Sequence, residues 1–133
     1  MAIQFSVAVR NARLDSIEST INTSAVLKIR TGGAPATCAS ADSGTVLSTL
    51  SLPSDWLAAA SSGSKVLAGS WTDASADSTG TAQHFRVYAS DGTTCHIQGT
   101  VGIGSGDLQV DNTSFASGQS FTITAFTLTD GNS

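Results

Sequence analysis

A cysteine and a histidine stand side by side in the stretch DGTTCHIQGTV, which covers residues 91–101. Such a pair can supply a thiol nucleophile with its base, or two ligands for a metal ion, provided that the side chains meet. If this stretch is a strand, Cys95 and His96 point to opposite faces of the sheet and cannot touch. The other histidine, His84, falls on the expected partner strand, in a register that the sequence leaves open.

Three roles remain open for Cys95. A free cysteine is among the most buried residue types and packs as a small apolar side chain, which is the interpretation that we favour. A disulfide with Cys38, the second of the two cysteines, is less favoured, because a chain of this length needs no such bridge and reducing compartments keep thiols free. Catalysis or metal binding is the least favoured role.

Other residues that could do chemistry are weaker candidates. The carboxylate pairs Asp73 with Asp77 and Asp107 with Asp111 lack the spacing of an EF-hand and are better explained as solvated surface acids. The glycines of VGIGSGD have a phosphate-loop spacing, but the residues that follow predict a strand where a helix N-terminus is needed. We therefore expect no catalytic residue, no metal site and no cofactor.

Composition and charge limit the classes of protein to consider. The 133 residues suit a single domain, with an N-terminal strand or helix segment at 1–23 and a β body at 24–133. Charged residues make up 12% and the formal net charge is -4, so a phosphate backbone would be repelled and nucleic acid is not an expected partner. The sequence has no apolar run near the ~20 residues that span a bilayer. It also lacks a signal-peptide pattern, so we expect use without export or a membrane.

One helix precedes the β body. Leu14, Ile17 and Ile21 recur at helical spacing and predict a helix over 8–21. The apolar stripe that they form is narrow, so it must dock on the β body or on a neighbouring chain.

After residue 24 the apolar period changes from helical to two. The expected strands cover 24–31, 45–52, 64–71, 81–90, 93–102, 107–111 and 119–131. We also expect a long loop at 32–44 and a short helix from Ser54 to Gly63.

Turn signals complete the fold prediction. Asp91-Gly92 predicts an antiparallel hairpin with positive φ at both central turn positions. A shift in alternation near Ala125 predicts a β-bulge, or a strand covered on both faces. Short strands with turn signals about every ten residues predict a mainly β protein, an antiparallel β-sandwich of jelly-roll or Greek-key type with one N-terminal α-helix.

Five segments stand out when the chain is taken as a whole: FSVAVRNARLDSIESTI, VLKIRTGGAPATC, LPSDWLAAA, TAQHFRVYASDGTTCHIQGTVG and SFTITAFTLTDGN. Together they cover nearly the full chain and resemble small virion structural proteins of tailed bacteriophages, most of all the capsid cement, or decoration, proteins. The shared motifs are packing and turn signatures. The resemblance therefore implies a β-sandwich or jelly-roll-like body without catalytic residues.

The resemblance also implies a function and partners. A cement protein sits on the outside of the capsid shell and bridges major capsid subunits, often as a homo-oligomer, with a dimer favoured here over a trimer. Assembly in the host bacterial cytoplasm agrees with the missing signal peptide. The candidate interface residues are Arg10, Arg13, Leu14, Ile17, Trp56, Lys65 and Trp71.

Two other functions remain open. The same composition permits a tail, neck or fibre-associated virion component. A glycan-binding jelly roll is the alternative from a different class, and it requires exposed Trp56, Trp71 or Tyr88 along one groove. For the two tryptophans we favour a place in the core over a place in an interface.

Overall fold

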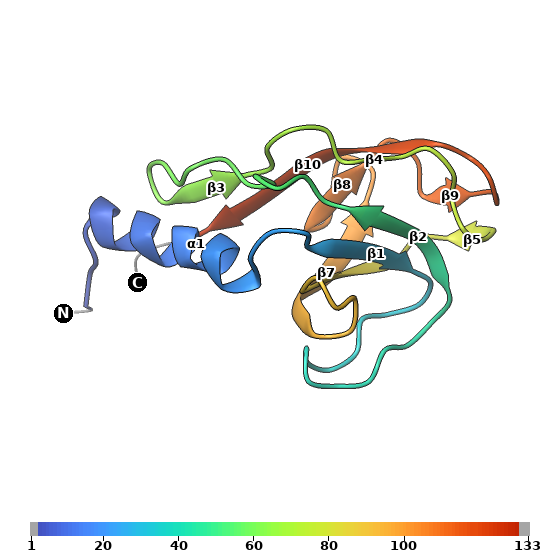
Figure 1. Ribbon diagram of the computed structural model, residues 1–133, viewed down its shortest axis with the longest axis horizontal. Helices are drawn as coiled ribbons and strands as arrows, with labels where there is room; N and C mark the ends of the chain where they lie inside the picture. The colour runs from blue at the N-terminus through green and yellow to red at the C-terminus, as the bar shows by residue number, and fades with distance from the viewer. Residues whose placement is uncertain (1–2, 131–133) are drawn as a thin grey trace.

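A curled β-sheet with one helix at its end makes up the protein (Figure 1). The computed structural model describes residues 3–130. Its elements are α1 (Val7–Ile21), β1 (Val26–Arg30), β2 (Val46–Ser51), β3 (Ser64–Val66), β4 (Thr72–Asp73), β5 (Gly80–Thr81), β6 (His84–Tyr88), β7 (Cys95–Gly102), β8 (Leu108–Val110), β9 (Ser114–Phe115) and β10 (Phe121–Thr129). The predicted class, mainly β with one N-terminal helix, is confirmed.

Capping residues set both ends of α1. The Ser6 side chain accepts a hydrogen bond from the backbone N–H of Val9 at 3.2 Å and so satisfies one of the unpaired donors of the first turn. Asn22 ends the helix, because its φ of 72° and ψ of -171° lie far from helical values. The N–H of Asn22 donates to the Glu18 carbonyl at 2.7 Å. The helix predicted over 8–21 is confirmed.

The apolar stripe of α1 docks on the β body of the same chain. Leu14 and Ile21 are buried, and Ile17 packs against the core. The helix lies along β3 at one end of the sheet (Figure 1). The sequence left open whether this stripe docks on the β body or on a neighbouring chain. In the structure it docks on the β body of its own chain.

The main sheet is mixed. Its strands lie in the order β2-β1-β6-β7-β8-β10-β3, with β4 also paired to β10, while β5 and β9 form a separate pair. We expected antiparallel pairing throughout, but β7 and β8 are parallel, with Val101 opposite Leu108. Gly104 and Gly106 between them have φ of 65° and 83°, values that glycine adopts readily. These glycines let the chain complete a tight loop before β8 begins.

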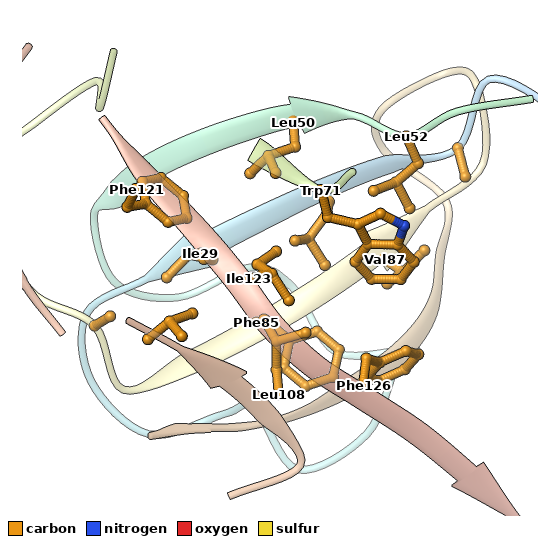
Figure 2. Packing of buried hydrophobic residues seen from close by; sticks show 14 of the residues in the cluster. Ile29, Leu50, Leu52, Trp71, Phe85, Val87, Leu108, Phe121, Ile123 and Phe126 are labelled. Atoms are coloured by element: carbon orange, nitrogen blue, oxygen red, sulfur yellow. The ribbon is translucent and has the colours of Figure 1, made fainter. Parts of the chain in front are cut away.

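The curl brings the two halves of the sheet face to face over the core. Side chains of β1 and β6 meet those of β10, which crosses them at a steep angle (Figure 2). Phe126 on β10 lies 5.7 Å from Phe85 on β6, edge to face, and 5.5 Å from Trp71. At the rim, Ser48 on β2 donates a hydrogen bond to Asp73 on β4, which joins strands from the two halves.

The β6–β7 hairpin is confirmed, but its turn differs from the predicted one. The two strands pair antiparallel, with His84 opposite Thr100 and Tyr88 opposite Cys95. Within the connection only Gly92 has a positive φ, since the turn spans Ala89 to Gly92 and is closed by a 2.9 Å backbone hydrogen bond. The predicted bulge in the last strand is also confirmed, because the register of β10 against β8 shifts between Ile123 and Ala125.

The short helix predicted from Ser54 to Gly63 is wrong. Residues 57–67 form an extended hairpin instead, in which Leu57 bridges Leu67 and Ser61 bridges Ser64. Ser62 and Gly63 both have positive φ, at 52° and 75°, and a tight hairpin turn needs these values at its two central positions. The strand predicted at 64–71 shortens to β3, and two further short strands, β4 and β5, lie between Trp71 and β6.

Candidate interaction surface

Cys95 and His96 do not form a reactive pair. Cys95 is half-buried while His96 is exposed. The Cys95 thiol donates to the Ile97 carbonyl at 3.4 Å. Burial, together with the neighbouring Cys38 thiol, raises the pKa of Cys95 to about 12, so its nucleophilic thiolate is scarce at neutral pH.

The second histidine is too far along the hairpin to act as the base for Cys95. His84 lies opposite Thr100, whereas Cys95 lies opposite Tyr88 at the other end of the same strand pair. The His84 side chain is fully buried, and its Nδ1 lies 2.6 Å from the Gly32 carbonyl oxygen. His84 therefore supports a loop, and among residues 3–130 its Nε2 has no hydrogen-bond partner.

The carboxylates that could have formed cation sites are engaged in local hydrogen bonds. Asp73 accepts from Ser48, and Asp77 accepts from Thr49. Asp107 accepts from the backbone and side chain of Thr100, and Asp111 accepts from the Thr122 N–H. Within residues 3–130, no three His, Cys, Asp or Glu side chains gather as a metal site requires.

A buried cluster of charges that we did not predict lies on the outer face of the sheet. Arg30 on β1 and Arg86 on β6 are 6% and 1% exposed. Arg86 donates to Asp42 Oδ1 at 2.6 Å, and Arg30 reaches Asp42 Oδ2 at 3.0 Å. Tyr88 also donates to Asp42, at 2.6 Å. Burial raises the pKa of Asp42, but hydrogen bonds from Tyr88 and Arg86 outweigh it and hold the pKa below its ordinary value.

This cluster fastens the covering loop, residues 31–45, onto the sheet. Arg86 donates to the carbonyls of Thr37 at 2.9 Å and Ser40 at 3.1 Å. Gln98 donates to the Pro35 carbonyl at 2.6 Å. The loop therefore covers the outer face of β1, β6 and β7 around Arg86 and Gln98. The signal for this cluster in the sequence was weak. Arg30 and Arg86 each stand beside an apolar strand residue that points into the core, and an unusually long loop follows Arg30.

A second set of ion pairs holds α1 against the body. Lys65 on β3 is 2% exposed and contacts Asp15 at 2.7 Å and Glu18 at 3.1 Å. The hydrogen bond from Lys65 lowers the pKa of Asp15. Arg10 donates to the Asp130 carbonyl at 2.6 Å, and Arg13 pairs with the Asp130 carboxylate at 3.1 Å. These contacts fasten the helix to both β3 and the end of β10.

Most of the predicted interface residues are not on the surface. Leu14, Trp56, Lys65 and Trp71 are buried, at 3% exposure or less. Leu14, Trp56 and Trp71 pack in the core, and Lys65 forms ion pairs with α1. In the folded chain these four side chains are therefore not accessible to a partner. Ile17 and Arg10 are half-buried. Arg13 alone remains open, with 53% of its side chain exposed.

The exposed apolar surface lies just before these residues in the chain. We define the N-terminal apolar segment as Ile3, Phe5, Val7 and Val9, which are 75%, 43%, 49% and 43% exposed. The Arg13 guanidinium lies 5.0 Å from the centre of the Phe5 ring. The many apolar residues in IQFSVAVR, interrupted only by Gln4 and Ser6 before Arg10, are the signal that could have identified this segment from the sequence.

Comparison of the chain with known proteins and structures finds no relative. No family model, curated protein or solved structure matches the chain. Over residues 3–130, the structure contains no helix that is both long and apolar enough to cross a membrane. The arrangement of these residues is thus the basis on which a function can be proposed.

Proposed function

We propose that this chain is a non-enzymatic structural protein of a tailed-phage virion, which binds the capsid exterior as a cement protein. Its partners would be the major capsid protein and a second copy of itself. The observation that carries the proposal is the N-terminal apolar segment, four apolar side chains within seven residues that are each at least 43% exposed. Exposed apolar surface marks contact sites with other macromolecules, and these four side chains supply such surface at the N-terminal end of the described chain. The resemblance to cement proteins supports the same function.

The way α1 is anchored suits a docking role. The buried Lys65 and the half-buried Asp130 hold the helix on the body through ion pairs with Asp15 and Arg13, while residues 3–9 extend to the end of the molecule away from the core (Figure 1). A segment held in this way can contact a neighbour without exposing the core. Binding to the assembled shell in preference to free subunits would stabilise the shell by mass action, and repetition over many copies would multiply the effect.

The glycan-binding alternative finds less support. It needs aromatic rings exposed along a groove, but Trp56, Trp71 and Tyr88 are 0%, 1% and 0% exposed. A tail, neck or fibre-associated role uses contact surfaces of the same kind. It differs from the cement role in the place and the number of copies on the particle.

Replacing Val7 and Val9 with threonine tests the docking role of the segment. Each change exchanges a methyl group for a hydroxyl of similar size at a position already in water, so the fold should be kept. We expect binding to purified shells to weaken about tenfold, because each lost apolar contact contributes about 0.8 kcal/mol. Sedimentation of shells with bound protein measures the affinity.

Ile103→Thr is the matched control, because Ile103 is also apolar and is 60% exposed, on the β7–β8 loop. This variant should bind as the original chain does. Salt gives an independent measurement, since apolar contact persists when charges are screened beyond a Debye length of ~10 Å at 0.1 M. Equal binding by the double valine variant, or release from shells in moderate salt, would contradict a contact through the apolar segment.

A further inference from the structure

The two cysteines of the chain lie together, although 38 and 95 are far apart in sequence. Cys38 is in the covering loop and Cys95 is the first residue of β7. Both are free and half-buried, and both line one cavity together with Asp42, Arg86, Thr93 and Thr94. The Cys38 thiol is near enough to that of Cys95 to help raise its pKa.

The surrounding structure holds each thiol in place. Cys38 sits in a turn closed by a 3.0 Å hydrogen bond from the Ser40 N–H to the Thr37 carbonyl. Arg86 donates to the carbonyls of these same two residues, on either side of Cys38. Cys95 is fixed on the other side by strand pairing with Tyr88. The buried arginine that anchors the loop therefore also positions Cys38 over the start of β7.

We propose that Cys38 and Cys95 are a site of reversible oxidation, which forms a disulfide between the covering loop and β7 when the chain meets a low-molecular-weight disulfide such as oxidised glutathione. In reducing surroundings the pair stays as two thiols that take part in packing. The inference goes beyond the proposed function, because it concerns the folded chain whatever its partner is.

The reaction is a pair of thiol–disulfide exchanges. The thiolate of Cys38 attacks one sulfur of the reagent, the reagent's S–S bond breaks, and the leaving thiolate takes up the proton that Cys38 released. Cys95 then attacks the sulfur of Cys38, and the second reagent thiol leaves with the proton of Cys95. The two protein thiols lose two electrons in total, and the reagent disulfide is reduced to two thiols.

The order of the two steps follows from the site. Cys38 lies on the covering loop and is the thiol that starts the reaction, because the raised pKa of Cys95, about 12, keeps its thiolate scarce at neutral pH. The second step is intramolecular, and the position of the two sulfurs gives it a high effective concentration. The mixed disulfide on Cys38 is therefore short-lived when Cys95 is present.

Oxidised glutathione added to the purified, reduced full-length chain tests the proposal. We expect the intact mass to fall by two hydrogen atoms, both thiols to disappear, and a peptide that links residues 38 and 95 to be recovered after digestion. The bridge removes conformational freedom from the unfolded chain, so the Tm should rise by about 10 °C and return on reduction.

Single-cysteine variants are the matched controls. Cys95→Ser should keep one glutathione on Cys38 as a stable adduct, and its Tm should not rise on oxidation. Phenylarsine oxide, which needs two close thiols, should bind the reduced original chain and neither Cys38→Ser nor Cys95→Ser. This measurement tests proximity without oxidation.

Three results would overturn the proposal. The first is a chain that collects a glutathione adduct on each cysteine without forming the internal bridge. The second is oxidation that yields only dimers linked between chains. The third is failure of phenylarsine oxide to bind the folded, reduced chain. None of these results bears on attachment to a shell, so the proposed function stands or falls separately.

Discussion

Arg86 is the side chain on which the position of the covering loop depends most. Its guanidinium is buried and donates to a carboxylate, a side-chain amide and two loop carbonyls. A planar fork of donors can serve several acceptors at once, whereas the single ammonium of lysine cannot. Each side-chain nitrogen of Arg86 donates a hydrogen bond within the chain. Its role is therefore to hold the loop in place.

Arg86→Lys should lower the free energy of unfolding by about 3 kcal/mol, because buried acceptors lose their donors while the charge stays buried. Urea unfolding followed by tryptophan fluorescence measures the change. Arg13→Lys is the control, since that side chain is 53% exposed, and it should change stability by no more than about 0.5 kcal/mol. Equal effects of the two variants would show that the cluster does not hold the loop.

Asp42 links the stability of the chain to acid pH. Because its pKa in the folded chain lies below the ordinary value of 3.8, its contribution is present above that value and is lost as the pH falls through the folded pKa. Asp42→Asn should be less stable at neutral pH but should lose stability less steeply below about pH 4. Urea midpoints across the acid range measure the slope.

Asp55→Asn, at an exposed site, is the control for the loss of one carboxylate. Asp15 also has a lowered pKa through its hydrogen bond from Lys65, so some slope must remain in Asp42→Asn. If the slopes of the original chain and Asp42→Asn coincide, the carboxylate of Asp42 is not held by the arginines in solution.

At the scale of elements, α1 is part of the core and also the support of the N-terminal apolar segment. Leu14 is 3% exposed, so Leu14→Ala should destabilise the protein by about 3 kcal/mol. Val7→Ala, at a position that is 49% exposed, should change stability by at most about 0.5 kcal/mol. Thermal unfolding of both variants measures these changes. If Leu14→Ala is as stable as the original chain, the helix is not docked on the body.

Local signals explain which elements could be predicted. The helix, the β6–β7 hairpin and the bulge near Ala125 each depend on residues close in sequence, through apolar spacing, an Asp-Gly turn and a break in alternation. The hairpin at 57–67 was missed because Ser54 resembles a helix N-cap while Ser62 adopts a φ of 52°. Serine seldom adopts a positive φ, so its presence did not predict this turn.

The candidate site could be predicted less well, because its contacts join distant segments. Nothing near Arg86 in the sequence indicates Asp42, and nothing near Lys65 indicates Asp15 or Glu18. Burial of Trp56 and Trp71 depends on how the whole sheet curls over them. The parallel pairing of β7 with β8 likewise follows from the route of the chain through a glycine turn.

At the scale of the whole molecule, the described residues divide into a packed body and an apolar end. The body buries its two tryptophans and the cationic side chains Arg30, Lys65 and Arg86. Four of the six exposed large apolar side chains lie in residues 3–9. A molecule built in this way suits attachment to a larger assembly at one end, which is the central claim of the proposed function.

The number of copies on the purified particle tests that claim most directly. Phage particles can be purified, digested and measured by mass spectrometry against labelled peptides of this chain and of the major capsid protein. A cement protein repeats with the symmetry of the shell, so we expect on the order of hundreds of copies per particle, recovered with heads and not with tails. About a dozen copies or fewer, recovery with tails, or absence from the particle would contradict it.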